Sequence, residues 1–285
     1  MLDTRLHTFL VLCETMNYTR AAERLCITQP AVTHHIHFLE EHYGCRLFSY
    51  EGKTLRLTEK GRRLRELARS LAYNSQKMEE VLAAPTLTPL RVGATKTIGE
   101  FVIGPLVTRF LRKHPETPFS LTVENTQVLL QALEEGQLDF VLVEGFFDRQ
   151  RYDTRLYRRE EFFGVCPPDH PLAGRTVPLE ALLSERIIVR EEGSGTRAIF
   201  EEALHRQNRT LGSFSNVVTI SDFSTIKQLV IDHLGVSFLY APVVERELAG
   251  GTLARFDLTE PLSGAFHFVC LKDNLFAQDW ADWLE

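Results

Sequence analysis

Gln29, Thr33 and His34 are three polar residues that lie close together in the sequence, with apolar residues between and after them. They fall at the amino end of a predicted helix, on the side opposite its apolar stripe. Amide, hydroxyl and imidazole groups match the donors and acceptors that base edges present in a major groove. Their spacing therefore indicates hydrogen bonding to bases rather than bond making or breaking.

Two short predicted helices position these side chains. Thr28 is a good amino-terminal cap, and Pro30 fits the first turn of a helix, where its missing N–H has no intrahelical partner. The apolar positions form one face on each helix: Ala21, Ala22 and Leu25, then Val32, Ile36, Leu39 and Tyr43. The pattern predicts a helix-turn-helix, with an ordinary corner between two helices as the alternative.

The segments around this stretch carry further motifs in a fixed order: AAERL, TQPAV, LE, G-x-RLF and LTE-x-G. Over about sixty residues they closely resemble the LysR-type transcriptional regulators of bacteria. The resemblance implies an α+β protein with an N-terminal winged helix-turn-helix, a long linker helix, and a C-terminal two-lobed α/β effector domain like type 2 periplasmic solute-binding proteins. The expected domains are 1–58, 59–89 and 90–285, with lobe I at about 90–161 and 265–285 and lobe II at about 162–264.

The resemblance also implies contacts with double-stranded DNA. The run RLFSYEGKTLRLT predicts a hairpin, the wing, with Lys53 at its tip. Where the family usually shows Ser-Arg or Ser-Lys, this chain has Thr33-His34, so a charged bidentate base contact is missing. The expected DNA-contacting residues are Thr19, Thr28, Gln29, Pro30, Ala31, Thr33, His34, Lys53 and Thr58.

Charge and composition agree with a DNA-binding protein. The net charge is −6, but residues 1–84 hold twelve basic and ten acidic residues, and 46–69 hold eight basic and three acidic. A local basic stripe is what phosphate contact requires. No apolar run is long enough for a membrane span and no secretory signal is present, so we expect the cytoplasm. The five cysteines show no C-x-x-C spacing, which argues against disulfides and zinc.

A long helix is predicted from Thr58, its cap, to about Leu82. Its apolar positions repeat at spacings of four and three, which is a heptad seam for pairing with a second copy. Packing against the C-terminal domain is the alternative. We expect a homodimer, and by resemblance a homotetramer, on an interrupted palindrome. The seam comprises Leu64, Ala68, Leu71, Ser75, Met78 and Leu82.

From Leu90 onward, strand-like and helix-like segments alternate, which predicts an α/β fold with parallel strands. Helices are expected around 101–113, 128–135, 198–207 and 223–233, and a short one ends the chain at WADWLE. The segment 83–89, with two prolines, is expected to be a hinge.

Two loops are candidates for effector binding, because each follows a strand and opens a helix, where free N–H groups attract anions. By the resemblance they face each other across a cleft between the lobes, and Glu144 ends a strand entering the same cleft. Hydroxyls and cations there predict a small anionic effector, with Glu144 meeting a hydroxyl or amine on it. The candidate residues are Thr95, Lys96, Thr97, Glu144, Ser194, Gly195, Thr196 and Arg197.

Other classes of protein fit less well. Ser194 lies between glycines but lacks the G-x-S-x-G spacing of a hydrolase, so no enzyme activity is expected. His34, His35 and His37 lack the cysteine or carboxylate needed to complete a metal site, and no cofactor is expected. A redox- or metal-responsive regulator of the same fold remains an alternative.

Overall fold

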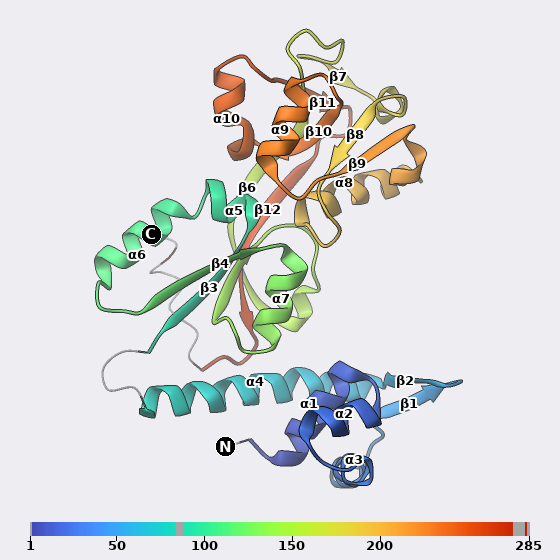
Figure 1. The fold of residues 1–285 in the computed structure, drawn as a ribbon, viewed down its shortest axis with the longest axis vertical. Coiled ribbons are helices and arrows are strands. Elements are labelled where there is room, and N and C mark those ends of the chain that lie inside the picture. The colour runs from blue at the N-terminus through green and yellow to red at the C-terminus, as the bar shows by residue number, and fades with distance from the viewer. Residues whose placement is uncertain (1, 84–87, 276–282, 284–285) are drawn as a thin grey trace.

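The computed structural model describes residues 2–83, 88–275 and 283. Most of the predicted hinge at 83–89 and most of the predicted terminal helix therefore lie outside the described residues. A small helical unit with a hairpin, one long helix and a larger sheet-containing unit follow each other along the chain (Figure 1). Among the described helices, none has the length and apolar character needed to cross a membrane.

The N-terminal unit is the predicted helix-turn-helix with its wing. Asn17 caps α2 and Thr28 caps α3, while the Glu51-Gly52-Lys53 turn joins the two strands, with Gly52 at φ +64°. Glycine adopts this left-handed conformation without steric cost. The elements are α1 (Thr4–Thr15), α2 (Tyr18–Leu25), α3 (Gln29–Tyr43), β1 (Phe48–Glu51) and β2 (Thr54–Leu57).

The predicted apolar stripe of α3 is correct except at its end. Val32, Ile36 and Leu39 are buried, but Tyr43 is 46% exposed, so its prediction as a core residue is wrong. α3 stops at Gly44, which has left-handed backbone angles. Tyr43 therefore lies on the last turn beyond the core, with its ring against that of His42.

A buried carboxylate fixes the wing to α3. Glu40 accepts a hydrogen bond from the backbone N–H of Leu47 at 2.8 Å and forms an ion pair with Arg46 at 2.7 Å. Satisfying a buried carboxylate in this way is what makes its burial tolerable. The hairpin consequently has a defined orientation relative to α3.

The long helix α4 (Glu59–Ala83) connects the two units and lies alongside the larger one in Figure 1. Thr58 caps it, since its hydroxyl accepts from the backbone N–H of Gly61 at 2.9 Å. The first turns of α4 pack into the core of the N-terminal unit through Leu64 and Ala68.

The larger unit is built on a continuous mixed sheet of two α/β lobes. Its strands are β3 (Leu90–Thr95), β4 (Phe119–Glu124), β5 (Phe140–Val143), β6 (Tyr152–Cys166), β7 (Thr176–Val177), β8 (Arg186–Val189), β9 (Asn216–Thr219), β10 (Val236–Tyr240), β11 (Ala254–Leu258) and β12 (Ser263–Leu271). The main path runs β4-β3-β5-β12-β6-β10-β8-β9. The prediction of parallel strands is confirmed for β3, β4 and β5 and for β8, β9 and β10.

The prediction of parallel strands is wrong for β6 and β12, which run antiparallel to each other. β6 pairs with β12 as far as Glu161 and with β10 from Phe162 onward. Its fifteen residues therefore contribute to both lobes. β6 and β12 therefore connect the two lobes, and the boundary between the lobes lies along these strands.

Helices cover the sheet as expected from the alternating pattern. The helix expected around 101–113 is α6, which begins at Gly104 with Pro105 in its first turn, and a separate short helix, α5, precedes it. The α-helices are α5 (Lys96–Phe101), α6 (Gly104–Lys113), α7 (Thr126–Glu134), α8 (Gly195–Arg206), α9 (Phe223–Ile231) and α10 (Ala241–Ala249), and the 3₁₀ turns are η1 (Arg149–Arg151), η2 (Leu179–Leu182) and η3 (Leu211–Ser213).

Candidate functional site

The amino end of α3 presents polar side chains to solvent. Gln29 and His34 are exposed and Thr33 is half-buried. The Gln29 side-chain amide donates to the Thr33 hydroxyl at 2.9 Å, which orients it before any base is bound. Thr28 accepts from the Ala31 N–H, so its hydroxyl has a capping role as well. An exposed polar surface at the amino end of a helix is the arrangement that base contacts in a major groove require.

The remaining predicted DNA residues divide into two groups. Thr19, Pro30 and Lys53 are exposed and Ala31 is half-buried, with Lys53 at the tip of the wing. Thr58 is instead engaged within the protein, because its hydroxyl donates to the carbonyl of Arg46 at 2.7 Å while capping α4. Its local role is to join the wing to the linker helix.

The three neighbouring histidines have separate environments. His35 Nδ1 lies 2.9 Å from the Thr8 hydroxyl and holds α3 against α1, whereas His34 and His37 are exposed. No group of three or more histidine, cysteine or acidic side chains among the described residues is arranged to hold a metal ion.

Replacing Gln29 with Ala is expected to weaken operator binding by roughly 1 to 3 kcal/mol and to relax the base preference at one position, because a bidentate amide contact is lost. Lys53→Ala should weaken binding to all sequences alike and reduce the salt dependence. Fluorescence anisotropy with operator and scrambled duplexes at several salt concentrations measures both. An unchanged affinity and selectivity in Gln29→Ala would show that the reading face is misassigned.

The exposed face of α4 differs from the predicted seam at its amino end. Leu64 and Ala68 pack into the N-terminal core, so their prediction as intermolecular contacts is wrong. Leu71, Met78 and Leu82 are exposed, as the seam requires, and Ser75 is half-buried. Leu67 and Val81, which the pattern missed, add to the same apolar surface.

We expect this apolar surface to pair two copies of the chain, since an exposed leucine row on a long helix is typical of a dimer interface. Leu71→Glu should convert the dimer to a monomer in light scattering at micromolar concentration. Glu79→Gln, at an exposed position on the same helix, is the matched control. A fully dimeric Leu71→Glu protein contradicts the assignment.

The opposite face of α4 binds the effector domain through a buried polar cluster that the sequence did not reveal. Asp139 accepts a hydrogen bond from the Tyr73 hydroxyl at 2.8 Å and pairs with Lys77 at 2.7 Å. It also accepts from the backbone N–H of Arg91 at 2.7 Å. Lys77 and Asp139 are 3% and 6% exposed, so neither charge is screened by water.

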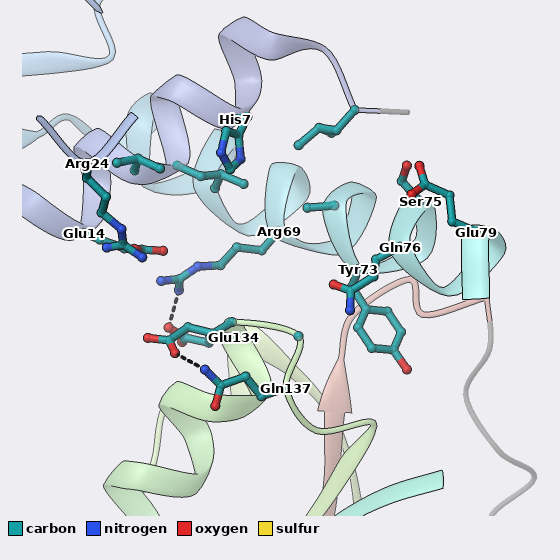
Figure 2. A pocket seen from close by; sticks show the side chains of 16 residues that line it. His7, Glu14, Arg24, Arg69, Tyr73, Ser75, Gln76, Glu79, Glu134 and Gln137 are labelled. Atoms are coloured by element: carbon teal, nitrogen blue, oxygen red, sulfur yellow. Dashed lines mark hydrogen bonds and ion pairs between the residues drawn. The ribbon is translucent and has the colours of Figure 1, made fainter. Parts of the chain in front are cut away.

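A second cluster lies nearer the DNA-binding unit. Glu134 of α7 is contacted by Arg69 of α4 and by Arg151, and it accepts from the Tyr152 hydroxyl at 2.6 Å. Figure 2 shows Arg69 pointing from α4 toward Glu134 across a cavity of about 430 Å³. α1 also lines this cavity, so the linker helix and both units meet here.

The two predicted effector loops meet around Glu144. Its Oε1 accepts hydrogen bonds from the hydroxyls of Thr97 at 2.7 Å and Thr196 at 3.0 Å, one from each lobe. Its Oε2 is buried and makes no hydrogen bond of normal geometry with the described residues, while the nearby Thr95 hydroxyl lowers the pKa of the carboxyl. Burial raises the pKa of the Glu144 carboxyl to about 6, and the hydroxyl hydrogen bonds oppose that shift. The predicted anion-binding hydroxyls therefore already hold a carboxylate of the chain itself.

Two glycines let the lobes approach at this point. A Cβ on Gly145 would lie 2.5 Å from the Cα of Gly195, and one on Gly195 would lie 2.4 Å from the Glu144 carbonyl oxygen. The glycines thus permit direct backbone packing. The expectation that the Gly-rich loop leaves N–H groups open to a ligand does not hold for Gly195, which is buried.

An open cavity of about 330 Å³ adjoins the same loop. Ser194, Gly195 and Arg197 line it from lobe II, and Gln127 and Tyr152 are among its lining residues from lobe I. Thr95, Lys96 and Thr97 do not line this cavity. Of the two predicted effector loops, only the one around Ser194 therefore lines this open cavity.

The predicted cations are paired with carboxylates. Lys96 donates to the Ser221 carbonyl at 3.2 Å and lies 3.8 Å from Glu191, and Arg197 pairs with Glu201 at 2.8 Å. Arg190, which the sequence pattern did not single out, is 3% exposed, pairs with Glu191 and lies over the Phe223 ring. A bound anion would have to compete with these carboxylates.

Ser194 and the three buried cysteines lack the features of activated nucleophiles. Ser194 is buried at the cap of α8, and its hydroxyl makes no hydrogen bond to a histidine within the described chain. Burial raises the pKa of the thiols of Cys13 and Cys270 to about 12 and that of Cys166 to about 11. Thiols held in the neutral form are poor nucleophiles and poor redox sensors.

Comparison with known proteins agrees with both halves of this structure. The family model "Bacterial regulatory helix-turn-helix protein, lysR family" matches residues 4–62, and the model "LysR substrate binding domain" matches residues 85–285. The RuBisCO operon transcriptional regulator of Allochromatium vinosum is 31% identical over 258 residues, covering 89% of this chain and 84% of the relative.

Solved structures show the same arrangement. A full-length variant of OxyR from Pseudomonas aeruginosa matches with a TM-score of 0.57 and 25% identity, over 96% of this chain and 95% of that one. The regulatory domain of CcmR from Synechocystis PCC6803, in complex with 2-PG, matches with a TM-score of 0.61 and 25% identity, over 70% of this chain and 96% of that domain. The relatives are named as transcriptional regulators, which agrees with the expectation of a protein that is not an enzyme. With a helix-turn-helix that presents a polar reading face and a two-lobed domain behind it, the chain belongs to the LysR-type transcriptional regulators, which bind DNA and a small-molecule effector.

Proposed function

We propose that the protein regulates transcription in response to a small organic anion carrying a hydroxyl or amine, bound between the two lobes near Glu144. The observation that carries the proposal is the buried Glu144 carboxylate, which is hydrogen-bonded by one threonine from each lobe while its Oε2 makes no hydrogen bond of normal geometry with the described residues. A buried acceptor without a donor is costly, and a ligand hydroxyl or amine at Oε2 would remove that cost.

The charge of the effector follows from the surrounding cations. Lys96 and Arg197 lie on facing loops, and the carboxylates with which they pair are only partly buried. A ligand carboxylate or phosphate would replace those pairs with contacts shared between lobes. The similar regulatory domain of CcmR was solved with 2-PG bound, which supports a small-molecule effector here. We propose Thr95, Lys96, Thr97, Glu144, Ser194, Gly195, Thr196 and Arg197 as the effector-binding residues.

Control of DNA binding follows from the two-lobed architecture. A ligand that binds one lobe angle more tightly than another shifts the population by its difference in affinity. The linker helix contacts lobe I through Asp139 and Glu134, so a change in the lobes reaches α4 directly. We propose that the chain acts as a dimer or tetramer in the cytoplasm, on an interrupted palindrome, with domains at 1–58, 59–89 and 90–285.

A thermal-shift screen of small organic acids tests the effector. At a hundred times its dissociation constant the correct compound should stabilise the protein by about 2.7 kcal/mol. Thr97→Val and Ser194→Ala should each reduce that rise in melting temperature while leaving DNA binding without ligand unchanged. Thr108→Val, on the exposed side of α6, is the control.

The screen has a clear negative outcome. If only neutral or cationic compounds stabilise the protein, the effector is not an anion. If both variants respond like the parent, the effector binds elsewhere.

A further inference from the structure

A separate cavity of about 240 Å³ lies between the lobes where β12 begins. None of the residues proposed for the effector lines it, although Gly145, which follows Glu144 in the chain, does. Lobe I contributes Arg149, Arg159 and His267, and α8 of lobe II contributes Glu202 and Arg206. Any ligand in this cavity would therefore contact both lobes.

The charges lining the cavity are unbalanced. Arg149 and Arg159 form no ion pair and no side-chain hydrogen bond with any described residue. Arg206 pairs at 3.2 Å with Glu202, which is the one acidic side chain among the described residues of the lining. Three guanidinium groups around one concave surface produce a positive potential that concentrates anions.

A buried polar atom points to the same ligand chemistry. His267 is only 4% exposed, and its Nδ1 makes no hydrogen bond within the described residues. Its ring lies edge-on to Phe147, with centroids 5.9 Å apart. Burial and the charges of Arg149 and Arg159 lower the pKa of His267, and a hydrogen bond with the backbone of Ala265 opposes that shift. A neutral imidazole N–H can donate to an anion that also neutralises the arginines.

We propose that this cavity is a second anion site, which binds a small, multiply charged oxyanion through Arg149, Arg159 and His267, with Arg206 contacting it from the other lobe. A guanidinium group can donate two parallel hydrogen bonds to two oxygens of one phosphate or carboxylate, so it binds these anions more specifically than an ammonium group does. The cavity volume of about 240 Å³ is many times the space that a single water needs, which leaves room for a small phosphate monoester or dicarboxylate. Because such a ligand contacts both lobes, it would favour one angle between them, which is the same angle that the effector changes.

Isothermal titration of the full chain tests the site. The probes are inorganic phosphate, glycerol 2-phosphate and malonate, each against chloride at equal ionic strength. The double variant Arg149→Gln/Arg159→Gln should weaken binding of the preferred probe at least tenfold. The control Arg112→Gln/Arg155→Gln removes the same charge outside the cavity and should bind like the parent. His267→Phe should also weaken binding, since it keeps the ring but removes the donor.

Each outcome decides the question. Tighter binding of glycerol 2-phosphate supports a phosphate monoester, and tighter binding of malonate supports a dicarboxylate. Equal weakening in both double variants would show a general charge effect and overturn the site, as would heat signals no larger than those of chloride. Thr97→Val separates this site from the proposed function, because it should lower the effector response and leave phosphate or malonate binding unchanged.

Discussion

Replacing Asp139 with Ala is expected to lower the free energy of unfolding by about 3 kcal/mol, because it leaves the buried ammonium group of Lys77 without its nearest partner. Removing one member of a buried pair costs about 3 to 5 kcal/mol. The lower end applies here because Glu80 remains 3.3 Å from Lys77. The Tyr73 hydroxyl loses its acceptor at the same time.

Urea denaturation of the full chain measures this loss, and hydrogen exchange locates it. Exchange should rise most in α4 around residues 70–80, because the cluster joins that helix to lobe I. Asp153→Ala removes an exposed carboxylate from β6 and should change stability by less than about 0.5 kcal/mol. Unchanged exchange in α4 of Asp139→Ala would mean that the cluster does not hold the linker helix.

The contacts of the Asp139 cluster could not be predicted from the sequence. The capping and spacing signals that predicted α2, α3, the wing and α4 are local, and the structure agrees with them. Tyr73 and Lys77 follow the polar side of α4 and have the pattern of a solvent-exposed face. Their partner is more than sixty residues away, so only the tertiary structure pairs them.

Local sequence patterns were also insufficient to predict the full length of β6 and the contacts of the α4 seam. β6 begins at Tyr152, but Arg155, Arg158 and Arg159 break its apolar alternation, so the apolar pattern of a strand is clear only from Phe162 onward. The heptad spacing could not show that Ala68 packs inside its own unit, because helical periodicity does not identify the surface that a face contacts.

The sequence predicts that the two effector loops face each other across a cleft and bind an anion, but in the structure their threonine hydroxyls bind the carboxylate of Glu144. Glu144 was placed in the same cleft as the threonines, but its strand gives no indication that its carboxylate would receive their hydroxyls. The contact depends on Gly145 and Gly195 allowing two backbones to meet, which is a property of the folded pair.

Glu144→Gln is expected to stabilise the protein by about 2 kcal/mol at pH 8 and by much less at pH 4.5. Burial raises the pKa of Glu144 from 4.5 to about 6, so the folded state holds the proton more tightly than the unfolded state. Stability from this group is therefore complete below pH 4.5 and is lost as pH rises through 6. That rise in pKa corresponds to about 2 kcal/mol, and the glutamine amide carries no charge to desolvate.

Urea denaturation of the parent and Glu144→Gln at pH 4.5, 6 and 8 measures the difference, with Glu124→Gln at an exposed position as the control. A constant difference across this range would show that Glu144 does not titrate as a buried carboxyl. The same measurement bears on the effector. A ligand hydroxyl or amine donating to Oε2 stabilises the charged form, so a saturating effector should reduce the pH dependence of the parent toward that of the variant. An effector that stabilises the parent equally at all three pH values would not be bound at Oε2, and the donor proposed for it would be wrong.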